Sequence, residues 1–242
     1  MRFANLHNYM DICRNNTEIM RIKDILVRYG ISTLGLVLVA LGVGLSIKSN
    51  FGIAPPSCPP TALFAQWPVV SFGTYTWFFN CAFIVVQFCL RPQWFDWLLG
   101  LMQVLAVLFF GYLCDACIWL VDAGIPAQSL TGSILLSLGA ILVTALGIKL
   151  EVLGKGWILP VDQMNAVIAQ MGQFRYSNVK ITCDILLVTA TVILCWIFFG
   201  SLIGSPGLNI VYWGTLLLAF GVGLCMKLTD PLMDRLFGRF VK

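Results

Sequence analysis

Long apolar segments alternate with short polar stretches along most of this chain. Six segments are apolar over roughly the 20 residues that a helix needs to cross a bilayer. Hydropathy places them at residues 29–48, 72–90, 97–120, 131–149, 177–199 and 209–227. This pattern predicts an all-α polytopic protein that crosses a membrane six times.

Two polar stretches broken by proline follow the first and the fourth of these segments. The second stretch, residues 154–184, carries five charged residues between two apolar segments. Pro160 ends any helix that arrives from upstream, and the pattern of residues 161–171 then predicts a short helix. The first stretch, NFGIAPPSCPPTALFAQ at residues 50–66, has the same order of turn, prolines and short apolar helix. We expect a broken, partly re-entrant helix in each stretch.

The two broken stretches belong to a repeat of three apolar segments. LGLVLVALGVGLSIK at residues 34–48 and LGAILVTALGIK at residues 138–149 share LG, ALG and IK in the same order. Because each copy crosses the membrane three times, the two copies must lie in opposite orientations, as in many transporters. The predicted parts are a polar leader (1–28), a first repeat (29–128, re-entrant at 50–67), a second repeat (129–230, re-entrant at 154–171) and a basic tail (231–242).

The composition agrees with a lipid environment. Of the 242 residues, 59% are hydrophobic and only 11% are charged, with a mean hydropathy of +0.89. A soluble domain carries about 25% charged residues. The net charge of +4 comes from basic residues at the ends of the apolar segments, which argues against a nucleic-acid partner.

The nine cysteines lie mostly inside the apolar segments, where cysteine behaves as a small apolar residue. Cys114 and Cys117 form a Cys-x-x-Cys around Asp115, so a redox role stays open beside the structural one. A zinc site needs about four ligands, and the only histidine, His7, lies in the leader on the other side of the membrane. No metal and no cofactor are predicted.

The placement of lysine and arginine predicts the orientation of the chain. With the N-terminus in the cytoplasm, 14 of the 15 basic residues fall on the cytoplasmic side, and only Lys48 lies outside. Cytoplasmic loops of membrane proteins carry an excess of these residues. We therefore expect both termini in the cytoplasm.

Four short motifs resemble the YczE/YitT-like family of bacterial integral membrane proteins. In the first half these are the Gly52–Pro55 turn and the Ser-Phe-Gly-Thr at residues 71–74. In the second half they are ILPVDQ at residues 158–163 and YSNVKITCD at residues 176–184. The resemblance covers residues 29–235 and implies the repeated architecture and a bacterial inner membrane. Ser57 stands where other members often carry an acid, so the resemblance does not imply a symmetric pair of acids.

Charged residues in the fifth apolar segment share one helical face. Asp184 lies one turn after Lys180 and about 12 Å from the start of the segment. A carboxylate at that depth is costly unless it is paired, which makes Lys180 its predicted partner. Asp162, at the start of the short helix, is expected to reach both. The predicted binding residues are Asp162, Lys180, Asp184, Gln163 and Asn165, with Ser57 at the equivalent position of the first repeat.

The same charges fit a second interpretation. Asp162 is a good helix cap, and an ion pair between Lys180 and Asp184 would hold a helix bundle together without binding anything. Four further charges lie at segment ends, either as cross-helix salt bridges or as independent interface residues. The predicted bridges are Lys48 with Asp115 near the outer interface and Lys149 with Asp230 near the inner one.

These observations predict a transporter or channel for a small solute or ion, with its polar site in the second repeat. The alternative is a non-transporting accessory or scaffold protein whose broken segments pack on a partner. The sequence has no phosphate loop, no Rossmann fingerprint and no nucleophile with a histidine base, so an enzyme is not predicted. The expected partners are the lipid bilayer, a small-molecule or ion substrate, and a second copy or another membrane protein.

Overall fold

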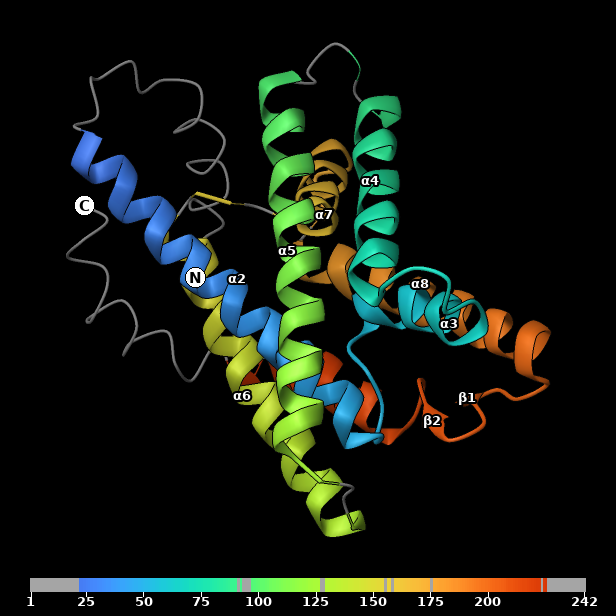
Figure 1. Cartoon of the computed structure of the whole chain (residues 1–242). Helices are drawn as coiled ribbons and strands as arrows, with labels where there is room; N and C mark the ends of the chain where they lie inside the picture. The colour runs from blue at the N-terminus through green and yellow to red at the C-terminus, as the bar shows by residue number, and fades with distance from the viewer. Residues whose placement is uncertain are drawn as a thin grey trace.

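The part of the protein that the structure describes is almost entirely helical (Figure 1). The computed structural model describes residues 22–90, 92, 97–126, 129–154, 156–157, 159–174, 176–222 and 224–225. The long helices are α2 (Ile22–Ser49), α4 (Phe72–Leu90), α5 (Trp97–Gly124), α6 (Leu130–Gly154) and α8 (Tyr176–Phe199). The short elements are η1 (Pro55–Ser57), α3 (Cys58–Gln66), α7 (Pro160–Met171), the strands β1 (Gly204–Ser205) and β2 (Leu208–Asn209), and a helix at Trp213–Val222.

Five helices of the described part of the chain are long and apolar enough to cross a membrane. Their outward faces carry large apolar side chains such as Trp97, Tyr112, Ile185 and Ile197, all more than half exposed. Water would not tolerate so much exposed apolar surface, whereas lipid solvates it, and each helix satisfies its own backbone hydrogen bonds. The chain is therefore a multi-pass membrane protein.

The predicted sixth crossing at residues 209–227 begins later than predicted in the part of the chain that the structure describes. β2 ends at Asn209, the first residue of that segment, and helical residues are described at Trp213–Val222 and at 224–225. Gly207, with φ at +86°, turns the chain back between the two strands, so no helix can begin before the hairpin closes. Residues 226–230 lie outside the described residues, and six crossings stay a prediction.

α2 and α6 pack side by side in opposite directions (Figure 1). Gly154, at the end of α6, lies against Ser32 near the start of α2. Near the other end of the contact, the hydroxyls of Ser137 and Ser49 are 3.1 Å apart. A Cβ on Gly147 would lie only 2.7 Å from a backbone nitrogen of α2. Glycine is what lets the two backbones approach so closely in lipid.

α4 and α5 form a second antiparallel pair, joined through two glycines. Gly73 and Gly111 leave no room for a Cβ on either helix. Asp115 Oδ1 accepts a hydrogen bond from Gly73 N at 2.7 Å, which satisfies a donor in the first turn of α4. α7 packs against α4 and α8, and α3 packs against α8. The short helices thus lie against α8 from both halves of the chain.

Candidate functional site

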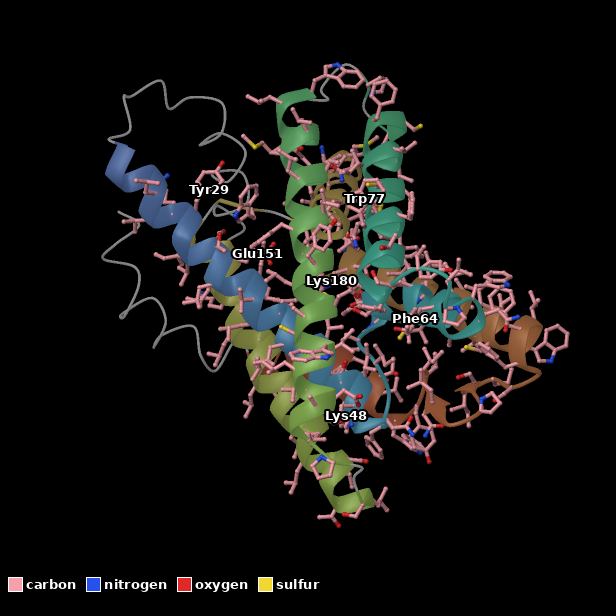
Figure 2. All side chains as sticks on the ribbon, in the orientation of Figure 1. Tyr29, Lys48, Phe64, Trp77, Glu151 and Lys180 are labelled. Carbon is pink, nitrogen blue, oxygen red and sulfur yellow. The ribbon has the colours of Figure 1, made fainter. Side chains whose placement is uncertain are left out.

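Three charged side chains meet where the short helix α7 begins beside the first turns of α8. Lys180 Nζ lies 3.5 Å from Asp162 Oδ1 and 3.7 Å from Asp184 Oδ2. The side chains of Lys180 and Asp162 are about one third exposed, at 34% and 30%, whereas that of Asp184 is 14% exposed. Figure 2 labels Lys180 in the middle of the molecule, near the crossing of α8 behind α5. The geometry brings together the three charged residues that the sequence analysis grouped.

Local sequence fixes the start of α7. Leu159 is extended, with φ −68° and ψ 139°, and Pro160 occupies the first helical position, where its missing N–H costs nothing. Leu159 N donates to Glu151 Oε1 at 3.1 Å, and Gln87 Nε2 donates to Pro160 O at 3.0 Å. α6 and α4 therefore both hold the residues at which α7 begins.

The expectation that Asp162 caps this helix is wrong, because Leu159 occupies the cap position. Asp162 lies inside the first turn, where the helix dipole still favours a negative charge. Its carboxylate lies within ion-pair distance of Lys180 on α8. An ion pair between two helices is therefore the geometry that the structure supports.

Gln163 and Asn165 also lie on α7, and both are buried. Neither side-chain atom of the Asn165 amide has a hydrogen-bond partner among the described residues. Ser57 lies in η1, which packs against α8. Within the described part of the chain, its hydroxyl bonds to none of the three charged side chains, so the structure leaves Ser57 outside their cluster.

The helix that carries Asp184, α8, packs against η1 and α3 of the first broken stretch. Burial, the neighbouring Cys195 and, more weakly, Asp184 raise the pKa of the Cys58 thiol at the start of α3. The protonated thiol donates to Ile53 O at 3.3 Å. One oxygen of Asp184, Oδ1, is buried and has no hydrogen-bond partner among the described residues. Asp184 thus lies on a helix that contacts both short helices.

The prediction that Lys48 pairs with Asp115 is wrong. Lys48 Nζ lies 2.5 Å from Asp122 Oδ1, while Asp115 accepts from the backbone of Gly73. α5 extends to Gly124, beyond the predicted end at residue 120, so its last turn and not the Asp115 turn faces the end of α2. Lys149 lies in α6, but Asp230 lies outside the described residues, and that pair stays a prediction.

Sequence reasoning missed a set of buried polar groups in α4 and α5. In the part of the chain that the structure describes, these side-chain atoms are enclosed without a hydrogen-bond partner. They are Thr76 Oγ1, Trp77 Nε1, Asn80 Oδ1 and both amide atoms of Gln103. Thr76, Asn80 and Gln87 recur at helical spacing in an otherwise apolar segment, and that recurrence was the available signal.

The described residues contain no group of three or more His, Cys, Asp or Glu side chains that could hold a metal ion. Eight cysteines of the described chain are free thiols, and Cys114 and Cys117 are both buried. The Cys-x-x-Cys therefore faces the protein interior, where α5 packs against α2 and α4.

A family whose model is described as "Family of unknown function (DUF6198)" matches residues 26–231, and the chain belongs to this family. The match includes both broken stretches and the five candidate membrane spans. Comparisons with curated proteins and with solved structures give no match. The resemblance to the YczE/YitT-like family is not tested by these comparisons and stays a prediction.

Proposed function

We propose that this member of the DUF6198 family is a transporter or channel that carries a small solute or ion across the bacterial inner membrane. The cluster of Asp162, Lys180 and Asp184 at the start of α7 carries the proposal. In the proposed topology, both termini lie in the cytoplasm and the chain crosses the membrane six times. The two halves are inverted repeats, and a broken helix in each half is partly re-entrant.

The starts of the two short helices support the inverted repeat. Ala54 precedes η1 with φ −60° and ψ 138°, and Leu159 precedes α7 with φ −68° and ψ 139°. Each is followed by a proline, Pro55 or Pro160, so both features recur at a spacing of 105 residues, from 54 to 159 and from 55 to 160. The same spacing relates Ser57 to Asp162. Only the second repeat then has an acid at this position.

The contact between α2 and α6 supports the same symmetry. A Cβ on Gly42 would clash with Thr144, and a Cβ on Gly147 would clash with Val39. The spacing of 105 residues maps Gly42 onto Gly147 and Val39 onto Thr144, so each contact is the copy of the other. Such reciprocal contacts are what a two-fold axis produces, here between two antiparallel helices. The axis then lies in the membrane plane, as in inverted-repeat transporters.

The cluster itself fits a binding role better than a purely structural one. Charged side chains within a membrane protein are costly, and they mark substrate or ion pathways. A structural pair would be expected to be enclosed and fully satisfied, whereas Lys180 and Asp162 are about one third exposed and Asp184 Oδ1 has no partner among the described residues. Lys180 can move its ion pair from one carboxylate to the other, because its Nζ lies within 4 Å of both Asp162 and Asp184. A cation or proton that binds to the Asp184 carboxylate would leave Lys180 paired with Asp162.

Ligand-dependent stabilisation tests the proposal. Purified protein is heated in nanodiscs with a panel of ions and metabolites, and solutes that raise its melting temperature are then tested for uptake into proteoliposomes. Asp184→Asn should fold and should lose both responses. Asp122→Asn is the matched control, because Asp122 is an exposed acid that pairs with Lys48.

The scaffold alternative predicts a different outcome. If Asp184→Asn fails to accumulate, or if the unaltered protein shows neither stabilisation nor uptake across the panel, then the cluster is a structural ion pair and the transport proposal is wrong.

A further inference from the structure

One face of α4 is polar although it is buried. Three polar residues, Thr76, Asn80 and Gln87, share this face with Ile84, and all four are buried. α5 crosses this helix at Gly73, and α7 contacts it at Gln87, whose amide donates to Pro160 O. Asn80 lies between these two contacts. Its carbonyl Oδ1 has no partner in the described chain, while its Nδ2 donates to Thr76 O at 2.9 Å.

Gln103 of α5 lies level with Asn80. The contact of Gly73 with Gly111 fixes the antiparallel register of the two helices. Asn80 is seven residues beyond its glycine, and Gln103 is eight residues before its own, so both lie about 10–12 Å from the crossing on the same side. Gln103 is only 2% exposed, and neither of its amide atoms has a partner among the residues that the structure describes.

α7 supplies a third unpaired amide. Asn165 is fully buried, and the helix that carries it packs against α4 and α8. One apolar cluster, which also includes residues of α2, contains Val161 of α7 and Phe110 of α5, and Trp77 of α4 and Leu187 of α8 pack against it. The indole Nε1 of Trp77 is also buried without a partner in the described structure. Figure 2 labels Trp77 on the part of α4 that lies next to α7.

Buried polar groups in native proteins are almost always hydrogen-bonded, to protein, to ordered water or to a ligand. The carbonyl of Asn80, both amide atoms of Gln103 and of Asn165, and the indole N–H of Trp77 lie on α4 and on the two helices that pack against it, and these are too many atoms to leave unpaired. Since each of these amides is enclosed away from lipid, its partner has to be a molecule held inside the protein.

We propose that Asn80, Gln103 and Asn165, with Trp77 beside them, bind a small uncharged solute that has several hydrogen-bond donors and acceptors. The inference rests on the proposed transport function and names the class of its substrate. An amide offers both N–H donors and a carbonyl acceptor, so the three match hydroxyl or amide groups on a solute. They carry no charge that would balance an ion. The charged cluster lies one turn away, because Asp162 precedes Asn165 by three residues on α7. In this proposal the charged cluster binds a coupling ion or proton.

Substitution of the unpaired glutamine tests the site. Full-length protein in nanodiscs is titrated with ribose, myo-inositol and nicotinamide as neutral probes, and with choline and glutamate as charged comparisons. At least one neutral probe raises the melting temperature, and Gln103→Met weakens its apparent affinity by about tenfold, the factor for one hydrogen bond. Without a probe, Gln103→Met melts no lower than the unaltered protein, because it removes an unpaired buried amide.

Thr191→Val in α8 is the matched control, because Thr191 is also a fully buried polar residue but its hydroxyl already donates to Leu187 O at 2.8 Å. This variant keeps the neutral probe's affinity. The inference is overturned if Gln103→Met and Thr191→Val respond alike to the neutral probes, or if no neutral probe binds. It is also overturned if a high-resolution structure shows that ordered waters alone satisfy the three amides in the presence of every probe.

The failure of this inference is separable from failure of the proposed function. Stabilisation and uptake of charged solutes only, lost in Asp184→Asn and unchanged in Gln103→Met, would overturn the neutral site and leave transport standing. Loss of every response, charged and neutral, would remove both.

Discussion

Lys48 Nζ at the end of α2 lies 2.5 Å from Asp122 Oδ1 in the last turn of α5. This pair ties the end of the helix that leads into the first broken stretch to the end of a neighbouring long helix. Asp115, two turns earlier on α5, instead accepts from the backbone N–H of Gly73. Two acids on one helix thus have different tasks, one at the exposed end and one at a helix crossing.

Removing these two acids should have unequal effects. The side chain of Asp122 is 73% exposed, so Asp122→Ala should lower the free energy of unfolding by less than about 1 kcal/mol. Asp115→Ala leaves a donor in the first turn of α4 without its charged acceptor and should cost about 1.5–3 kcal/mol. Unfolding of both variants in detergent, monitored by circular dichroism, measures the difference. A larger loss in Asp122→Ala than in Asp115→Ala would contradict the assignment.

The long helices were predictable because their signal is summed over many residues. The predicted segment 72–90 coincides with α4, and the predicted short helix 161–171 differs from α7 by one residue. The partner of Lys48 was not predictable in the same way. The identity of this partner depends on where α5 ends. The helix continues for four residues beyond the predicted end at residue 120, and this changes which acid faces Lys48. A helix boundary is set by local packing, which hydropathy does not record.

The charged part of the candidate site and its neighbour Asn165 were predictable, whereas Asn80 and Gln103 were not. A charge in an apolar segment is conspicuous, so Lys180 and Asp184 stood out, and the structure brings them to Asp162. Asn80 and Gln103 are single neutral amides among apolar residues, and such residues are common in membrane helices. Only burial and the lack of partners within the described chain distinguish them, and both are three-dimensional properties.

The α2–α6 contact should not tolerate a side chain at Gly147. A Cβ there would lie 2.7 Å from Val39 N and 2.8 Å from Gly35 O, both backbone atoms that cannot move aside. Gly147→Val should therefore separate the two helices and prevent accumulation of folded protein, measured by size-exclusion chromatography after membrane extraction. Gly139→Val on the same helix is the control, because a Cβ at Gly139 meets no atom within 4 Å. Equal yields of the two variants would refute the contact.

Lys180 and Asp184 should be energetically coupled. Lys180→Met leaves the mostly buried carboxylate of Asp184 without the ammonium group that balances its charge. Asp184→Asn removes that negative charge, so the neutral side chain no longer needs an ammonium partner. The double variant should therefore be more stable than the sum of the single effects implies, with a coupling of about 0.5–3 kcal/mol. A double-mutant cycle of unfolding free energies gives this number directly. Purely additive effects would mean that the two side chains do not interact in the folded protein.

Glu151 should set the position at which α7 begins. Its Oε1 accepts from Leu159 N at 3.1 Å, and both residues are buried, so the bond closes the turn between α6 and α7. Glu151→Gln keeps an acceptor oxygen and should cost little, whereas Glu151→Leu leaves a buried N–H unpaired and should cost about 1–3 kcal/mol. Because Pro160 and Asp162 follow directly, Glu151→Leu should also weaken any ligand response that depends on Asp184, while Glu151→Gln preserves it. Melting temperatures with and without ligand measure both effects. A ligand response in Glu151→Leu equal to that of the unaltered protein would show that the charged cluster keeps its geometry without this turn.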